Sequence, residues 1–272
     1  MTKRIFAFDL DGTLTNSKKE ISKNTKEMII KLQQEGNIMV LASGRPLLGV
    51  LPLALDLEFD RYGGYIICLN GAMIYNCKTN QKILDIELPK EYIEPLIKYS
   101  REKKIASLSY DSTSIITEMP NDRFVGFEAY NNKLEIKGVN NLIDYINFSI
   151  EKIMFVGDEN LILSFYDDIK EKFPKLSIYR SMPYFLEIMN VGIDKKEALK
   201  VLLDELKIER KNLISFGDGL NDLPMLEYSG FSVVMANASD DVKKYADYIT
   251  LSNDEDGVAY ALDKINRGEI YA

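Results

Sequence analysis

The chain has no histidine, and this absence narrows the chemistry available to it. Histidine acid–base catalysis, Ser-His-Asp triads and histidine-ligated metal sites are all excluded. Cysteine is almost as scarce, since Cys68 and Cys77 are the only two and their spacing does not repeat. We expect two buried thiols of a reducing compartment, with a disulfide between them as the alternative. Any catalysis must therefore use Asp, Glu, Lys, Ser, Thr or Tyr.

The sequence also has fewer basic than acidic residues, and it has no long apolar run. The sequence has 34 Lys and Arg against 42 Asp and Glu, which gives a net charge of −8. Proteins that bind the nucleic-acid backbone are usually basic, so we expect no nucleic-acid partner. No apolar run approaches membrane-spanning length, and the first one stops at Asp9, too early for a signal peptide. The sequence thus indicates a cytoplasmic protein with no membrane partner.

The apolar residues that are present form short runs. They are part of a 46% hydrophobic fraction over 272 residues, enough for one large or two modest domains. Runs at 5–8, 38–42 and 65–69 end in small or polar residues, as buried strands of a parallel sheet do. A helix through about Gln34 is expected between the first two, capped by Ser22 or by an Asn24–Glu27 capping box. This pattern predicts an α/β fold with a doubly wound, mostly parallel, Rossmann-like sheet.

The pattern changes near residue 85, where helices begin to alternate with shorter strands. One helix is expected at 91–103, while the stretch 120–147 is polar and rich in Asn. The shorter strands are expected at 107–110, 115–118, 152–156, 176–180 and 184–188. The doubly wound pattern resumes with a helix at 195–206 and strands at 213–216 and 231–235. We predict a core domain from residues 1–84 and 189–272, and an inserted α+β domain at 85–188 with its helices on one side of its sheet.

The first strand ends in two acids, Asp9 and Asp11, followed by Gly12. Ligands of open α/β sheets bind outside the carboxyl ends of the strands, which is where these acids lie. Two neighbouring acids repel each other, so the site needs a cation, a proton or both. A carboxylate nucleophile, a protonated acid and a metal would satisfy that need, as in phosphoryl transfer through an aspartyl-phosphate. The alternative is an ordinary Asp-Gly turn.

A second acidic loop follows the strand at 213–216. It contains Asp218, Asn221 and Asp222 between glycines, with no sulfur or imidazole nearby. Hard oxygen ligands of this kind favour Mg²⁺. We expect Asp9 and Asp218 to bind the ion directly and Asp222 to hold a metal-bound water. The alternative is a turn in which Asn221 or Asp222 caps the next helix.

Two further residues begin helices at the ends of predicted strands or loops. Ser43 and the N–H groups after it are placed to hold a phosphate oxygen, with a simple N-cap as the alternative. Lys195 beside the acids would offset their repulsion and hold a transferring phosphoryl group. Lys196 is its competitor, and spacing alone does not decide between them.

Six motifs in order resemble the haloacid dehalogenase superfamily of phosphohydrolases, and within it the Cof-like group with a large inserted cap (type IIB). They are DLDGTLTNS from Asp9, LASGR from Leu41, LNGAMIY from Leu69, GIDKKEAL from Gly192, FGDGLNDLPML from Phe216 and MANASDDVKKYAD from Met235. The resemblance spans the core, whereas the inserted domain is similar only in length and general pattern. One departure is Lys196, which stands where the family usually has glycine.

The resemblance implies a role for each matched residue. Asp9 is implied as nucleophile and Mg²⁺ ligand, and Asp11 as general acid/base whose backbone carbonyl also reaches the metal. Asp218 is implied as a ligand and Asp222 as its support. The remaining implied roles are phosphate binding for Ser43, Gly44, Lys195 and Asn221, the site entrance for Arg45, Asn70 and Gly71, and a buttress of the metal loop for Asn237.

The resemblance also implies the reaction. It is hydrolysis of a small phosphorylated metabolite, with sugar phosphates as the expected class, by a monomer or weak homodimer. Arg180, Tyr184 and Glu187 of the cap are candidates for binding sugar hydroxyls, unless they serve the cap's own sheet. A phosphomutase or phosphotransferase on the same core is the alternative enzyme, and a non-catalytic regulatory protein is the third possibility.

Overall fold

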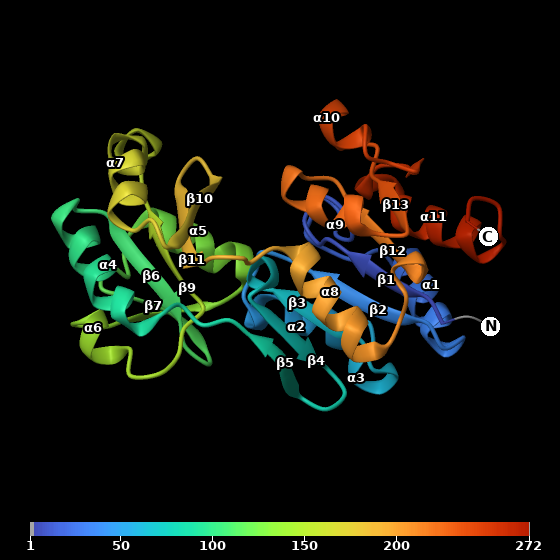
Figure 1. The fold of residues 1–272 in the computed structure, drawn as a ribbon, viewed down its shortest axis with the longest axis horizontal. Coiled ribbons are helices and arrows are strands. Elements are labelled where there is room, and N and C mark those ends of the chain that lie inside the picture. The colour runs from blue at the N-terminus through green and yellow to red at the C-terminus, as the bar shows by residue number, and fades with distance from the viewer. Residues whose placement is uncertain (1–2, 272) are drawn as a thin grey trace. The chain divides into compact units, whose positions relative to one another are not determined.

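The structure is a computed structural model and describes residues 3–271. It divides into two compact units (Figure 1). The first, here called the core unit, comprises the residues up to Leu84 together with those from Asp194 onward, and the second, the inserted unit, is Asp85–Ile193. Each unit has its own sheet, of eight and six strands respectively. The mixed α/β architecture with a mostly parallel core sheet confirms the predicted fold class.

The sheet of the core unit has the strand order β14-β13-β12-β1-β2-β3-β4-β5. Its strands are β1 (Ile5–Phe8), β2 (Ile38–Ala42), β3 (Tyr65–Cys68), β4 (Met73–Asn76), β5 (Gln81–Asp85), β12 (Leu213–Gly217), β13 (Phe231–Val234) and β14 (Tyr248–Ile249). All pairs from β14 to β3 are parallel, and β4 then returns antiparallel to β3. The pairing of β1 with β12, seen in Figure 1 as blue beside orange, joins segments far apart in sequence.

Apolar side chains from both faces of this sheet are buried by helices. The helices are α1 (Lys23–Gln34), α2 (Leu47–Asp56), α3 (Phe59–Tyr62), α8 (Lys195–Leu206), α9 (Leu223–Tyr228), α10 (Asp240–Lys243) and α11 (Gly257–Asn266). Leu199 and Leu202 of α8 share one apolar cluster with Ile5 and Ala7, so α8 covers that face of β1. Every residue of β1 is fully buried, which explains why its sequence is an uninterrupted apolar run.

The start of α1 differs from one of the two expected caps. Ser22 is the N-cap, and its hydroxyl accepts the backbone N–H of Thr25 at 3.1 Å. The expected capping box between Asn24 and Glu27 is wrong, because the Asn24 amide instead donates to Asp256 at 2.7 Å. A tertiary contact has therefore replaced a local one.

The inserted unit has a sheet in the order β10-β11-β9-β6-β7-β8. Its elements are α4 (Lys90–Glu102), β6 (Ala106–Tyr110), β7 (Ser114–Thr117), α5 (Arg123–Asn132), β8 (Glu135–Gly138), α6 (Leu142–Tyr145), β9 (Lys152–Val156), α7 (Glu159–Lys172), β10 (Leu176–Met182) and β11 (Phe185–Asn190). Most strand pairs are antiparallel, as an α+β unit requires. The polar stretch 120–147 holds α5, β8 and α6, which its composition does not indicate.

Helices cover both faces of this second sheet, so the expectation of helices on one side is wrong. Phe155 of β9 stacks on Tyr99 of α4 within one apolar cluster. Its neighbour Met154 points to the opposite face and joins a second cluster with Val125 and Ala129 of α5. Successive strand residues face opposite sides, so a helix on each side is needed to bury both.

The helices of residues 3–271 lack the length and apolar character that a membrane span requires. Cys68 and Cys77 are both buried thiols, as the sequence suggests.

Candidate functional site

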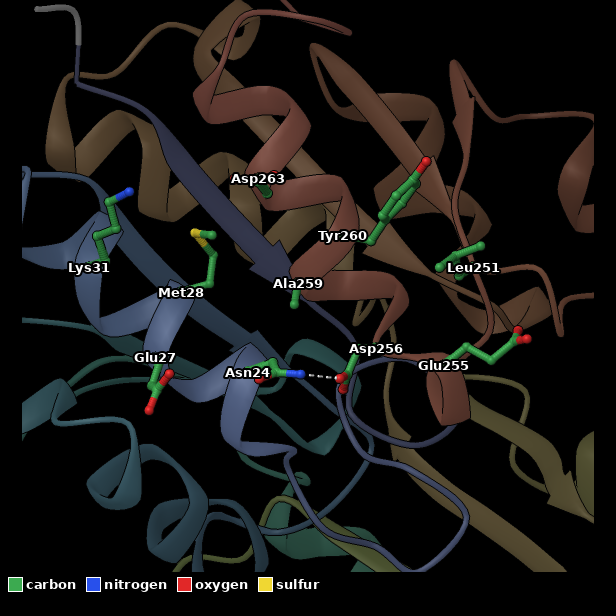
Figure 2. Close-up of a pocket in the computed structure, with 10 residues that line it drawn as sticks. All are labelled: Asn24, Glu27, Met28, Lys31, Leu251, Glu255, Asp256, Ala259, Tyr260 and Asp263. Carbon is green, nitrogen blue, oxygen red and sulfur yellow. Dashed lines mark hydrogen bonds between the residues drawn. The ribbon is translucent and has the colours of Figure 1, made fainter.

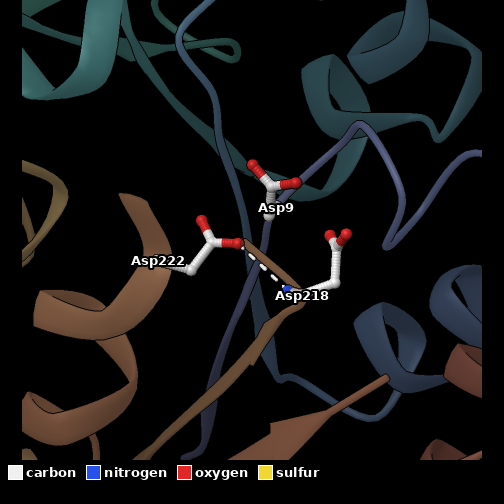
Figure 3. Close-up of side chains that lie close together, drawn as sticks. All are labelled: Asp9, Asp218 and Asp222. Carbon is white, nitrogen blue, oxygen red and sulfur yellow. Dashed lines mark hydrogen bonds between the residues drawn. The ribbon is translucent and has the colours of Figure 1, made fainter. Parts of the chain in front are cut away.

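Three acids converge at the carboxyl ends of β1 and β12. Asp9 directly follows β1, Asp218 directly follows β12, and Asp222 ends a short 3₁₀ turn after it (Leu220–Asp222). One carboxylate oxygen from each lies within 4.8 Å of the others, and the three side chains surround a common point in Figure 3. Asp9 and Asp222 are buried, and Asp218 is half-buried. The parallel pairing of the two strands produces this cluster, which we call the acid triad.

The loop after Asp9 is shaped to admit Asp218. Gly12 has φ +88°, and a Cβ there would lie 2.3 Å from Asp218 Oδ2, so only glycine fits. The Thr13 hydroxyl donates to Asp218 Oδ1 at 2.7 Å. Asn237 Nδ2 donates to the Gly12 carbonyl at 2.8 Å and to Asp218 Oδ2 at 3.4 Å. Asn237 thus contacts the loop that carries Asp218, which it was expected to support. The contact of Thr13 with Asp218 was not predicted from the sequence.

Lys195 is the cation of the acid triad. Its Nζ donates to Asp9 Oδ1 at 2.5 Å and to Asp222 Oδ1 at 2.6 Å, and its side chain is 1% exposed. Lys196, one residue on, is only half-buried. The start of α8 therefore turns Lys195, rather than its competitor, toward the acids.

Asp222 also shapes its own loop. Its Oδ2 accepts the backbone N–H groups of Asp218 at 3.1 Å and Gly219 at 2.9 Å. The same carboxylate therefore caps a turn with one oxygen and contacts Lys195 with the other. The alternative considered from the sequence, in which Asp222 caps the next helix, is wrong, because its side chain makes no cap hydrogen bond to α9 and instead accepts from the residues before it.

The charges of the acid triad do not balance. Three carboxylates and the Lys195 ammonium leave two negative charges uncompensated. Burial, together with the charge of Asp222, raises the pKa of Asp9 to about 8 although Lys195 opposes the shift. Burial likewise raises the pKa of Asp218 to about 6. Burial alone would lower the pKa of Lys195, but the charges of Asp222 and Asp9 outweigh it and raise that pKa.

A divalent cation fits this charge deficit and this donor set. Carboxylate oxygens are the ligands that hard cations such as Mg²⁺ prefer, and two positive charges would restore neutrality. Without an ion, the raised pKa values of Asp9 and Asp218 mean that protons take over part of this compensation as the pH falls.

Asp11 is not a member of the acid triad and has cations of its own. Arg45 donates from Nε to Asp11 Oδ2 at 2.8 Å and from a terminal nitrogen to Oδ1 at 2.6 Å. Lys19 Nζ donates to the same Oδ1 at 2.6 Å. Burial would raise the pKa of Asp11, but the hydrogen bonds and charges of Arg45 and Lys19 outweigh it and lower that pKa. Lys19 was missed by the sequence analysis, which offers no local signal for it.

Ser43 and Gly44 lie against the turn after β3. Ser43 is buried, and its hydroxyl accepts the Arg45 N–H at 3.2 Å. The Ser43 carbonyl accepts the Asn70 N–H at 3.0 Å, and Gly44 lies beside the Asn70 amide. Leu69 and Asn70 both have left-handed backbones, with φ +52° and +55°. Strained residues of this kind persist only where the surroundings hold them, and they are common at functional sites.

Gly71 joins the same turn to the start of α8. It has φ +115°, and a Cβ there would lie 2.3 Å from the carbonyl oxygen of Asp194. Asp194 immediately precedes Lys195. The close approach of Gly71 therefore fixes the backbone position from which the Lys195 side chain extends. Residues 69–71 thus contact both the Ser43 loop and the residue before Lys195. Asn221, by contrast, is exposed between Asp218 and Asp222.

The three cap residues considered for substrate binding have partners inside their own unit. Glu187 is buried and accepts from Lys152 at 3.0 Å. Arg180 donates to Glu159 at 3.0 Å, and the Tyr184 ring stacks on Phe124. These contacts correspond to the alternative in which the residues serve the unit's own structure.

A groove of about 520 Å³ lies between α1 and α11 of the core unit (Figure 2). Its lining includes no residue of the expected site. Its carboxylates have neighbours already, since Asp256 accepts from Asn24 and Asp263 pairs with Arg267 at 2.7 Å.

Known proteins resemble this chain over almost its whole length. A profile of the haloacid dehalogenase-like hydrolases matches residues 6–262. "Putative phosphatase YxeH" of Bacillus subtilis is 33% identical, over 96% of this chain and 98% of its own. The 5-amino-6-(5-phospho-D-ribitylamino)uracil phosphatase YcsE of the same organism is 29% identical, over 95% of this chain and 94% of its own. The crystal structure of a haloacid dehalogenase-like hydrolase from Bacteroides thetaiotaomicron superposes with a TM-score of 0.95 at 41% identity, covering 97% of this chain and 100% of that one.

Proposed function

Because the chain belongs to the haloacid dehalogenase-like hydrolase family, we propose that it is a Mg²⁺-dependent phosphatase of small phosphomonoesters that works through an aspartyl-phosphate. The observation that carries this proposal is the acid triad with Lys195 in contact with Asp9 and Asp222. It provides a carboxylate nucleophile, a fixed cation and a charge deficit that suits a divalent metal ion.

Asp9, Asp218 and the backbone carbonyl of Asp11 would hold the Mg²⁺, and Asp222 would support it. When bound, the ion supplies charge compensation for the carboxylates and for the transferring phosphoryl group. Lys195 adds a second, fixed positive charge beside Asp9. Ser43, Gly44 and Asn221 would bind the phosphate oxygens, and Arg45, Asn70 and Gly71 would lie at the entrance.

The reaction has two steps at phosphorus. An oxygen of Asp9 attacks in line, so that a bond from Asp9 to phosphorus forms while the bond to the leaving oxygen breaks. Asp11 in its protonated form, with its contacts to Arg45 and Lys19 open, gives that leaving oxygen its proton. A water that Asp11 then deprotonates attacks the same phosphorus, which releases inorganic phosphate and restores the Asp9 carboxylate.

The relatives favour hydrolysis over transfer and suggest a substrate class. The name of one B. subtilis relative describes a substrate with a phosphate ester on a ribityl chain. We place the substrate of this protein among sugar phosphates and related polyol phosphates. Release of inorganic phosphate without any acceptor or bisphosphate activator separates this function from that of a phosphomutase or phosphotransferase.

A screen of phosphorylated metabolites for phosphate release, with and without Mg²⁺, tests the proposal. Asp9→Asn is the matched blank, because it keeps the shape of the side chain and removes the nucleophile. We expect Mg²⁺-dependent release by the wild type and none by the variant, whose melting temperature should stay close to that of the wild type. Equal release by both proteins would exclude the covalent step.

A further inference from the structure

Asp11 is held on both of its oxygens by cations of the core unit. Oδ2 accepts from Arg45, and Oδ1 accepts from both Arg45 and Lys19. The Arg45 side chain is 13% exposed and that of Asp11 is 39% exposed, so their bidentate pair is partly shielded from water. Charge-assisted pairs of this geometry are among the strongest hydrogen-bonded contacts in proteins.

A tight turn at residues 16–20 places Lys19 beside Asp11. Lys19 has φ +61°, a left-handed backbone conformation that residues other than glycine seldom adopt. A tight turn maintains it, because the Lys19 N–H donates to the Asn16 carbonyl at 2.8 Å. The Asn16 side-chain oxygen also accepts the N–H groups of Lys18 at 2.9 Å and Glu20 at 3.0 Å.

The backbone of Arg45 is likewise held on both sides. Its N–H donates to the Ser43 hydroxyl, and its carbonyl accepts the Leu69 N–H at 2.9 Å. The guanidinium therefore starts from a fixed point next to Ser43, the residue proposed to bind phosphate. The hydrogen bonds of the Ser43–Arg45 loop therefore place the Arg45 guanidinium within reach of Asp11.

This placement conflicts with the role proposed for Asp11 unless the contact opens. A carboxyl group whose two oxygens both face cations has neither oxygen free to approach a leaving group. A phosphoryl dianion, although tetrahedral, also offers the guanidinium two negatively charged oxygens that it can bind at once. Arg45 therefore has an alternative partner that arrives only with the substrate.

We infer that Arg45 is a positioning residue that exchanges partners, holding Asp11 until a phosphoryl group enters and then binding the phosphate oxygens so that Asp11 is released. The exchange breaks the hydrogen bonds of Arg45 to Asp11 and forms others to phosphate, with no covalent change. It rests on the proposed function, in which Asp11 acts on the leaving oxygen. Lys19 retains Asp11 near the site while Arg45 moves.

Binding of inorganic phosphate in a double-mutant cycle tests this exchange. Isothermal titration in Mg²⁺ compares the wild type, Asp11→Asn, Arg45→Ala and the double variant. Asparagine competes poorly for the guanidinium, so Asp11→Asn should tighten phosphate binding about fivefold or more when Arg45 is present. In the Arg45→Ala background the same change should have less than about a twofold effect, since interacting residues are non-additive.

An equal effect of Asp11→Asn in both backgrounds would overturn the exchange, because Asp11 would then act through its charge alone. So would the absence of any tightening with Arg45 present. Arg45→Lys should show intermediate coupling, since an ammonium cannot span two oxygens as the guanidinium does. Arg61→Ala is the control for loss of one positive charge, because Arg61 is exposed and pairs locally with Glu58, and it should leave phosphate affinity unchanged.

The outcome for the exchange is separable from that for the proposed function. The cycle measures binding, whereas phosphate release by the wild type and by Asp9→Asn measures hydrolysis. A wild type that hydrolyses substrates but shows no coupling overturns only the exchange. A wild type that hydrolyses no phosphomonoester overturns the proposed function, whatever the cycle gives.

Discussion

Lys195 shows how much depends on the direction of one side chain. Two consecutive lysines begin α8, yet one is 1% exposed between two carboxylates and the other is half-buried. Both acids hold the buried ammonium, and in the proposed mechanism this fixes it where charge would develop on the transferring phosphoryl group. Asp11 illustrates the same point with other cations, since Arg45 and Lys19 determine which way its carboxyl faces.

The two lysines form a matched pair for mutation. Lys195→Ala should lower kcat by about 10²–10³, the loss typical for one electrostatic stabiliser. Lys196→Ala keeps the same helix and removes the same charge one residue away, so its kcat should stay within about threefold of the wild type. Steady-state kinetics on the best substrate of the screen measures both. A damaging Lys196→Ala with a silent Lys195→Ala would shift the phosphate-binding role to the second lysine.

The acid triad should make metal affinity depend on pH. The pKa of Asp9 is raised to about 8 and that of Asp218 to about 6, so a cation must displace protons below these values. Mg²⁺ affinity should therefore rise with pH between about 5 and 9. Titration calorimetry in buffers of different ionisation enthalpy measures the protons released, and a pH-independent affinity would contradict the shifts.

The same shifts predict a stability effect with a definite sign. An acid whose pKa is raised on folding stabilises the protein at low pH, and this contribution is lost as pH rises. For Asp9 the loss spans the interval from its ordinary pKa of 3.8 to about 8. Without Mg²⁺ the melting temperature should fall across this interval, and Mg²⁺ should restore it most at the alkaline end. Thermal scans with and without the ion at pH 5 and 8.5 measure the difference.

At the scale of elements, the turn Leu69–Gly71 positions two parts of the site at once. It contacts the Ser43 loop after β2 and the residue before Lys195 in α8. Its left-handed residues cost energy locally, and the hydrogen bonds of Leu69 and Asn70 to the carbonyls of Arg45 and Ser43 hold them in place. A substitution in this turn should therefore lower catalytic activity although it changes none of the acids.

A glycine can be required by a positive φ or by a lack of space for a Cβ, and Gly36 and Gly71 distinguish these two reasons. Both have positive φ, but a Cβ on Gly71 would overlap the Asp194 carbonyl while one on Gly36 would meet nothing within 4 Å. Gly36→Ala should cost about 1–2 kcal/mol of unfolding free energy, the price of the backbone conformation alone. Gly71→Ala should cost more and should also lower kcat, because it displaces the start of α8. Urea unfolding and kinetics measure the two effects, and equal losses in both variants would show that the overlap is relieved.

The inserted unit contains a buried ion pair that joins β9 to β11. Lys152 and Glu187 contact each other at 3.0 Å with side chains 2% and 6% exposed. Glu187→Ala removes the ion-pair partner of the buried Lys152 ammonium, on which the charge of Glu128 still acts, and should cost about 3 kcal/mol, the lower end of the range for a broken buried pair. Glu197→Ala is the control, because it breaks a 2.6 Å pair with Lys200 that is exposed, and should cost at most about 1 kcal/mol. Chemical denaturation of both variants checks the contrast.

At the scale of the whole molecule, the chain leaves the core unit after Leu84 and returns at Asp194. The core unit is therefore completed by segments separated by the entire inserted unit. That β1 pairs with β12 rather than with β2 alone is the reason that Asp9 meets Asp218. The acid triad therefore forms only when both segments of the core unit, before and after the inserted unit, are present.

Apolar run length and helical periodicity predicted much of this architecture. The strand at Lys152–Val156 and the helix at Lys195–Leu206 have the bounds that their sequence patterns indicate. The element α5 was missed because its sequence mixes polar and apolar residues, and its helical form rests on Asp122, which caps it, and on packing against Met154. The failed Asn24 capping box has a similar cause, since Asp256 offers that side chain a partner from a distant helix.

By itself the sequence determined the positions of the acids at strand ends, because burial of a strand requires an apolar run and its polar residues must follow. It also limited the donor atoms of the acid triad to oxygen, since the chain has no histidine and neither cysteine belongs to the cluster. Only the tertiary structure decided which cation meets which acid, pairing Lys195 with Asp9 and Arg45 with Asp11. Such partners come from segments far apart along the chain, and their distances exist only once the sheet has assembled.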